Sequence, residues 1–113
     1  MSAITTHVLD TSVGKPAAGV GVTLEKQEGG AWKTLASGAT NADGRAAELL
    51  SGGATLAAGT YRLRFDTAAY FRARGVESFY PHVEIVFHVK DTAQHYHVPL
   101  LLSPYGYSTY RGS

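Results

Sequence analysis

Residues 94–110 read QHYHVPLLLSPYGYSTY and predict a β-hairpin close to the C-terminus. Gln94–Leu102 forms the first strand, Ser103-Pro104 turns the chain, and Tyr105–Tyr110 forms the antiparallel neighbour. Successive side chains of a strand point to opposite faces, so alternation assigns each residue to a face. The inward set is Tyr96, Val98, Leu100 and Leu102, the outward set is His95, His97, Pro99 and Leu101, and Gly106, Ser108 and Tyr110 share one face of the last strand.

Short alternating segments also fill most of the remaining chain. Glu28–Gly30 is typical of a hairpin turn, and Asn41–Gly44 of a turn that opens a strand at Arg45. One segment differs, because Asp66–Gly75 has an N-cap candidate, good helix formers and a terminal glycine, which predict a short helix. This pattern predicts an all-β sandwich with one short α-helix. The expected strands include Thr5–Leu9, Val20–Leu24, Trp32–Ala36, Tyr61–Phe65 and Val83–Phe87.

Bulk composition limits the function classes. The 113 residues predict one domain over residues 1–113. A formal net charge of +1 offers no basic cluster for nucleic acid or an anionic membrane, and the absence of cysteine removes disulfides and thiolate chemistry. No apolar run approaches the roughly 20 residues of a membrane span, and the N-terminus lacks a secretory layout. We expect a cytoplasmic protein with neither nucleic acid nor a membrane as partner.

The outward faces of the first strand and the C-terminal hairpin carry an unusual mixture. In the first strand Ile4, Thr6 and Val8 share one face, and Thr5, His7 and Leu9 share the other. If these strands lie in one sheet, His7, His97 and Tyr110 project from the same outer face, beside leucines. A face of this composition should not stay exposed. A second subunit covering it would make the face an intersubunit cleft.

The five histidines divide into two groups. His82 and His88 have no convergent partner and are expected to be surface or structural residues. His95 and His97 have a spacing that can bind zinc, but two ligands are short of the three or four that a site needs. We therefore expect no metal site at these residues.

Acid–base chemistry is the better use of His7 and His97, because two imidazoles in one cleft can divide proton transfers near neutral pH. Arg45, after the Asp43-Gly44 turn, is either a solvated charge or a planar donor for a developing oxyanion. Ser113 lacks an identifiable Ser/His/Asp pattern and is not expected to be a nucleophile. These residues alone indicate an oligomeric β-sandwich with a His/Arg/Tyr cleft.

Three separated segments resemble the transthyretin-like protein family. They are Ile4–Asp10 followed by Gly14–Ala17, the Asn41–Arg45 segment with its D-G-R, and the long C-terminal stretch His95–Ser113, which ends in Y-R-G-S. The hormone-carrying branch of the family lacks histidine at the places of His7 and His97, has an acidic residue at Arg45, and does not end in Y-R-G-S. This chain resembles the hydrolase branch at each of these positions.

The resemblance implies a sandwich of two four-stranded sheets and a homotetramer with its sites where dimers meet. It implies hydrolysis of 5-hydroxyisourate, a product of urate oxidation, to 2-oxo-4-hydroxy-4-carboxy-5-ureidoimidazoline, without a cofactor. His7, Arg45 and His97 would be catalytic, with the choice of base between the histidines open. Substrate-binding residues would be Tyr110, Arg111, Gly112 and Ser113.

Two other functions are open on the residues alone. One is a non-catalytic carrier of a small aromatic ligand in the intersubunit channel, although paired histidines and an arginine suit a hydrophobic carrier poorly. The other is a zinc-binding structural or periplasmic module built on His95 and His97.

Overall fold

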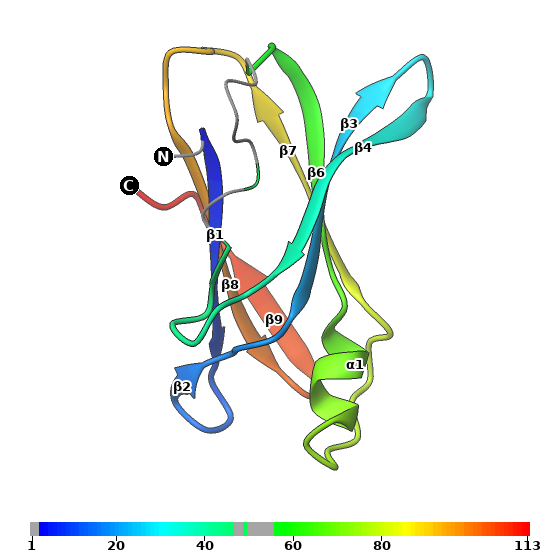
Figure 1. The fold of residues 1–113 in the computed structure, drawn as a ribbon, viewed down its shortest axis with the longest axis vertical. Helices are drawn as coiled ribbons and strands as arrows, with labels where there is room; N and C mark the ends of the chain where they lie inside the picture. Colours follow the sequence, from blue (N-terminus) through cyan, green and yellow to red (C-terminus); the bar gives the residue numbers. More distant parts are fainter. Residues whose placement is uncertain (1–2, 47–48, 50–55) are drawn as a thin grey trace.

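Two β-sheets pack face to face, and a short helix lies at one end of the sandwich in this computed structural model (Figure 1). The structure describes residues 3–46, 49 and 56–113. Among these residues, no helix has the length and hydrophobicity needed to cross a membrane. The predicted β-sandwich with a short helix is confirmed.

The first sheet is mixed, because its two long strands β1 (Ile4–Asp10) and β8 (Tyr96–Ser103) run parallel. It has five strands among the described residues, where four were expected, since the two-residue strands β2 (Lys15–Pro16) and β5 (Arg45–Ala46) both pair with β1. The second sheet is antiparallel. Its strands, in order, are β4 (Ala31–Ala39), β3 (Gly21–Glu28), β6 (Gly59–Phe65) and β7 (Val83–Val89).

The predicted C-terminal hairpin is formed by β8 and β9 (Gly106–Thr109), with Leu101 opposite Ser108. The last strand is shorter than expected, because β9 ends at Thr109 and Tyr110 lies beyond it. Pairing with β8 resumes at a single bridge between His97 and Gly112. The tail therefore stays beside β8 after the regular strand has ended.

The core lies between the two sheets, where their inward alternate sets meet. The predicted inward set of β8 is confirmed, since none of its members is more than 6% exposed. Ile4, Thr6 and Val8 of β1 are completely buried, and Leu24, Leu63 and Phe65 of the second sheet are completely buried in the same core. Burying each large apolar side chain contributes about 1.5–3 kcal/mol, so this core holds the long strands in register.

The helix α1 (Thr67–Arg72) follows β6 and is shorter than the predicted Asp66–Gly75. Asp66 occupies the N-cap position, but its side chain makes no capping hydrogen bond. The chain turns out of the helix through Gly75, whose φ is 70°, a conformation that glycine adopts without a steric cost. Tyr70 and Phe71 are buried, so the helix packs against the end of the core.

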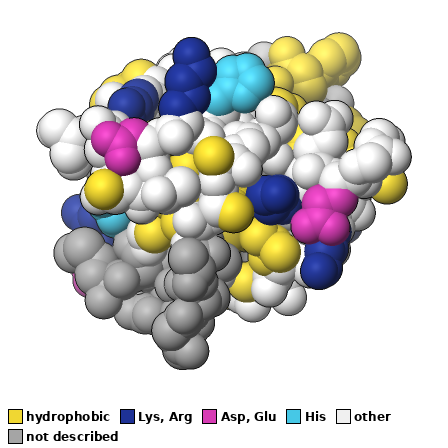
Figure 2. All heavy atoms as spheres, turned by 90° about the horizontal axis from the view of Figure 1, so that it is seen from above, with side chains coloured by type: hydrophobic (Ala, Val, Ile, Leu, Met, Phe, Trp, Pro, Cys, Tyr) yellow, Lys and Arg dark blue, Asp and Glu magenta, His cyan; other side chains and the backbone are white. Residues whose placement is uncertain are grey.

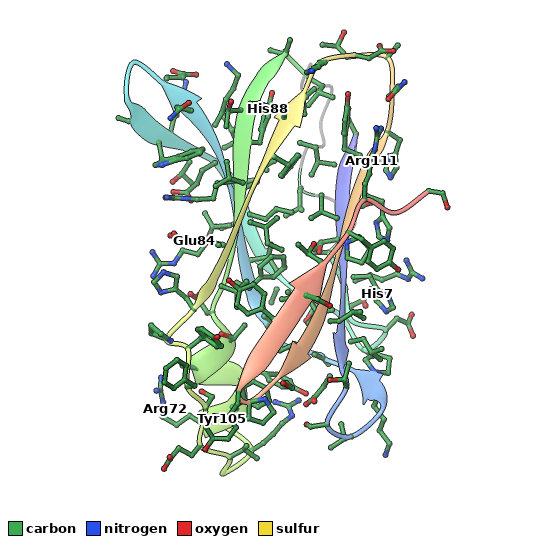
Figure 3. All side chains as sticks on the ribbon, turned by 180° about the vertical axis from the view of Figure 1, so that it is seen from behind. His7, Arg72, Glu84, His88, Tyr105 and Arg111 are labelled. Carbon is green, nitrogen blue, oxygen red and sulfur yellow. The ribbon has the colours of Figure 1, made fainter. Side chains whose placement is uncertain are left out.

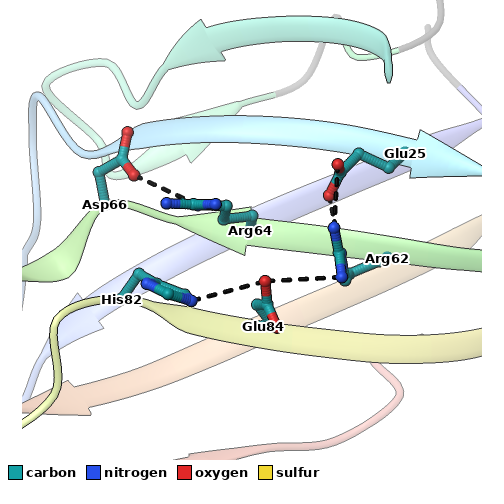
Figure 4. A network of polar contacts seen from close by, with 6 residues as sticks. All are labelled: Glu25, Arg62, Arg64, Asp66, His82 and Glu84. Atoms are coloured by element: carbon teal, nitrogen blue, oxygen red, sulfur yellow. Dashed lines mark hydrogen bonds and ion pairs between the residues drawn. The ribbon is translucent and has the colours of Figure 1, made fainter. Parts of the chain in front are cut away.

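The outer face of the second sheet is polar (Figure 4). Arg62 binds both carboxylate oxygens of Glu25, at 2.8 and 3.0 Å, and lies 3.6 Å from Glu84. His82 lies 3.5 Å from the same glutamate, while His88 contacts Thr60. His88 lies in β7 of the second sheet, and His82 immediately precedes that strand. Figure 2 shows one end of the sandwich. On the part of this surface that is drawn in colour, charged and hydrophobic side chains are interspersed.

Candidate active site

The central strand β1 brings the three predicted catalytic residues onto one outer face. On one side of β1, His7 is directly opposite Arg45 of β5. On the other side, Thr5 is directly opposite His97 of β8. Residues opposite one another in a sheet project to the same side, and Figure 3 shows His7 pointing away from the core. The predicted adjacency of His7 and His97 is thus confirmed.

The side chain of Thr5 forms a hydrogen bond with the imidazole ring of His97. The Thr5 hydroxyl oxygen is 2.8 Å from Nδ1 of His97, and the same oxygen is 3.0 Å from Nε2 of His95. Among the described residues, Nε2 of His97 has no hydrogen-bond partner. Sequence reasoning did not single out Thr5, although its position two residues before His7 places it on the same face of the strand.

The terminal segment touches His97 from a second direction. The amide of Gly112 donates a hydrogen bond to the carbonyl oxygen of His97 at 2.8 Å. A Cβ atom on Gly112 would lie 2.5 Å from Cδ2 of His97, so the imidazole ring rests directly over a position that has room only for glycine. Thr5 on one ring edge and Gly112 on the other fix the orientation of the imidazole.

The environment of His97 favours its neutral form. Burial lowers the pKa of His97, and the nearby charges of Arg45, His95 and His7 lower this pKa further, while a hydrogen bond to the backbone of Thr5 acts in the opposite direction. The unperturbed pKa of histidine is about 6.5, so His97 is neutral at pH 7 and can accept a proton there. This is the property that a general base requires.

The other members of the tail point in different directions. Arg111 lies with its guanidinium carbon 4.6 Å from the Tyr96 ring centroid, and the same guanidinium donates to the side chain of Gln94 at 2.8 Å. Tyr110 is 57% exposed, and Ser113 is exposed. The structure therefore brings Gly112 onto His97 and places Arg111 beside the start of β8 (Figure 3).

A cavity of about 260 Å³ lies between β7 and the tail. Tyr96, His97, Tyr110 and Arg111 belong to its lining, but His7 and Arg45 do not. Arg45 is exposed, and His7 and His97 are only half-buried, so the outer face that carries the three predicted catalytic residues is open in the single chain. The described residues contain no group of three His, Cys, Asp or Glu side chains placed to hold a metal ion.

The chain is similar in sequence and in structure to proteins of one known family. The HIUase/Transthyretin family model matches residues 4–112. The chain is 51% identical to the 5-hydroxyisourate hydrolase of Caulobacter vibrioides over 117 residues, which cover 100% of both proteins. It is also similar to the solved structure of Klebsiella pneumoniae 5-hydroxyisourate hydrolase, with a TM-score of 0.84 and 44% identity, covering 97% of this chain and 98% of the other.

Sea bream transthyretin in complex with thyroxine has a TM-score of 0.91 and 33% identity, and the match covers 98% of this chain and 95% of the other. The backbone is thus at least as similar to this transthyretin as to the Klebsiella hydrolase. Sequence identity has the opposite order, with 44% to the hydrolase and 33% to the transthyretin. Side chains, and not the fold, carry the distinction between the two kinds of protein.

Proposed function

The chain belongs to the HIUase/transthyretin family, and we propose that it hydrolyses 5-hydroxyisourate to 2-oxo-4-hydroxy-4-carboxy-5-ureidoimidazoline in urate degradation. It is an enzyme of the hydrolase branch. The observation that carries this proposal is the gathering of His7, Arg45 and His97 on one outer face around β1. An arginine and two imidazoles on one face suit hydrolysis of an amide-type bond better than they suit retention of an apolar ligand.

The reaction begins with a water molecule that the two histidines orient. His97 is the general base, because its neutral form is favoured and its Nε2 is unoccupied among the described residues. Nε2 takes one proton from the water, and the remaining hydroxide attacks the amide-type carbonyl carbon of the six-membered ring. The electron pair of the carbonyl moves to its oxygen, and the guanidinium of Arg45 stabilises this negative charge by hydrogen bonding.

Ring opening follows when the tetrahedral intermediate collapses. The carbon–nitrogen bond breaks, a carboxyl group forms, and the ring nitrogen takes the proton held by His97. His7 orients the water and a polar group of the substrate. The base returns to its neutral form, so the cycle needs no cofactor.

The tail completes the substrate pocket in this proposal. Tyr110 and Ser113 contact polar groups of the flat substrate, Gly112 keeps His97 in place, and Arg111 holds the tail against β8 and takes part in closing the pocket. A homotetramer provides the opposite wall, because the outer face is open in the single chain. The sites then lie where dimers meet.

Decay of freshly prepared 5-hydroxyisourate, followed by absorbance, tests the proposal. The purified protein is expected to accelerate the decay, while Arg45→Ala and His97→Asn each lower kcat/KM by about 100-fold or more. His82→Asn is the matched control, because this histidine lies near Glu84 of the second sheet, outside the candidate site. Wild-type protein that leaves the decay rate unchanged contradicts the hydrolase function and favours the carrier function. Full activity in both site variants contradicts the roles proposed for Arg45 and His97.

A further inference from the structure

Thr5 joins two histidines through a single hydroxyl group. Its oxygen is within hydrogen-bond distance of Nδ1 of His97 and of Nε2 of His95, and the threonine is only 8% exposed. A hydroxyl carries one proton, so it satisfies both contacts by donating to one ring and accepting from the other. If the nitrogen of one ring that faces Thr5 carries a proton, the nitrogen of the other ring that faces Thr5 must therefore be unprotonated.

We propose that Thr5 is a positioning residue that couples the tautomers of His95 and His97 and holds His97 in the form whose Nε2 accepts a proton. The inference rests on the proposed hydrolase function of the site. In the competent arrangement, Nδ1–H of His97 donates to the Thr5 oxygen, and the Thr5 hydroxyl donates to Nε2 of His95. The Nε2 atom of His97 then presents a lone pair.

The opposite arrangement is inactive. There, Nε2–H of His95 donates to Thr5, and Thr5 donates to Nδ1 of His97, which moves the proton of neutral His97 onto Nε2. His97 can then only donate a hydrogen bond through Nε2, and it takes no proton from water. The positive charge of Arg45 acts on His97, and a lone pair on the free edge of the ring accommodates this charge better than an N–H group does, which favours the competent arrangement.

The competent arrangement is also prepared for the proton transfer itself. When Nε2 of His97 takes a proton from water, Nδ1–H continues to donate to Thr5, and no hydrogen bond behind the ring has to change. Such preorganised polar groups are a main source of catalytic rate enhancement. The hydroxyl and the two rings therefore act as a unit that is set before the substrate binds.

Thr5→Val removes the hydroxyl at nearly constant volume, and Thr5→Ser keeps it. We expect the valine variant to lower kcat by about 10-fold to 100-fold with little change in KM, and the serine variant to restore most of the loss. Thr60→Val is the control, because Thr60 forms a similar contact, at 3.2 Å, with Nδ1 of His88 on the second sheet. A chelator in all assays removes adventitious zinc. A valine variant with wild-type kcat overturns the proposal.

Nitrogen-15 NMR of the imidazole rings provides a test that does not depend on turnover. Neutral His97 of the wild-type protein should be found as the Nδ1–H tautomer, the one that free histidine populates less, and Thr5→Val should shift it towards the Nε2–H tautomer. An Nε2–H tautomer in the wild-type protein overturns the proposal, even if the valine variant fails to fold. If the protein does not hydrolyse 5-hydroxyisourate, the hydrolase function fails, and the tautomer measurement still decides this coupling.

His95→Gln tests the coupling through the tautomer of His97. Glutamine at this position cannot exchange a ring proton with the Thr5 hydroxyl, so neutral His97 should change its share of the Nδ1–H tautomer in the nitrogen-15 spectrum. A tautomer share equal to that of the wild-type protein shows that His95 does not control His97, and the coupling is then wrong.

Discussion

Gly112 lies against the proposed base so closely that a single methyl group should disturb it. In a Gly112→Ala variant, the new Cβ would lie 2.5 Å from Cδ2 and 3.2 Å from Cγ of His97, and the imidazole must move aside. We expect kcat/KM to fall by about 100-fold, since displacements near 1 Å have effects of this size. The melting temperature should change little, because the segment is at the surface. Steady-state assays and thermal unfolding measure the two quantities.

Gly106→Ala is the control for this variant. It adds the same methyl group to a glycine of the same hairpin, but there the nearest atom, the Ser103 hydroxyl, is 3.7 Å away, an ordinary contact distance. A large loss of activity in this control, or none in Gly112→Ala, contradicts the contact between Gly112 and His97.

Individual residues of the site differ in how far the sequence predicts them. His7 and His97 follow from alternation, because both stand out as titratable groups within apolar strands. Thr5 does not, since threonine is an ordinary strand residue and its importance depends on lying opposite His97 in a parallel pair. Arg111, which the signature predicts to bind substrate, contacts Gln94 and Tyr96 in the single chain, and its role towards substrate stays a prediction.

The elements are predicted well where one face is buried, as in β1 and β8, because the core enforces strict alternation. Their ends are predicted less well. Tyr110 continues the alternation of the last strand, yet β9 stops at Thr109 and only Gly112 pairs again with β8. The strand β2 has no recognisable sequence pattern, since its two residues are too few to show a period.

One hydrogen bond connects α1 to the end of β1. The hydroxyl of Tyr70 donates to the carboxylate of Asp10 at 2.8 Å, and both side chains are buried. Tyr70→Phe should lower the free energy of unfolding by about 1–3 kcal/mol at pH 8, because the buried carboxylate loses a partner. Tyr105→Phe is the control, since Tyr105 is 64% exposed. Urea denaturation of the three proteins measures the difference.

The same bond makes this contribution dependent on pH. Burial and the neighbouring Asp10 raise the pKa of Tyr70 from 10.0 to about 12. The folded state therefore holds this proton more tightly than the unfolded chain, and the stabilisation is fully present below pH 10 and is lost as pH rises towards 12. The stability difference between wild type and Tyr70→Phe should shrink between pH 8 and pH 12. A difference that does not change with pH contradicts this explanation.

The two outer faces of the molecule are unlike each other. The second sheet exposes a network of ion pairs around Arg62 and Glu84, which is suited to water (Figure 4). The first sheet places Leu9 directly opposite Leu101 on its outer face, which also carries the predicted catalytic residues. Both leucines are only half-buried in the single chain. A second apolar surface that covers this face therefore gains free energy by burying them, whereas the charged outer face of the second sheet provides no such gain.

Leu101→Asp should therefore separate the proposed tetramer through its outer face. A charge among apolar groups at an interface is costly to desolvate, so the variant should sediment well below four times the 12.0 kDa chain mass, where the wild type is expected. If the site needs its second wall, kcat/KM should fall together with the mass, although Leu101 does not react with the substrate. Val76→Asp is the control, because it places the same charge on a 40% exposed valine beyond the helix. A Leu101→Asp monomer with full activity means that one chain alone forms the site.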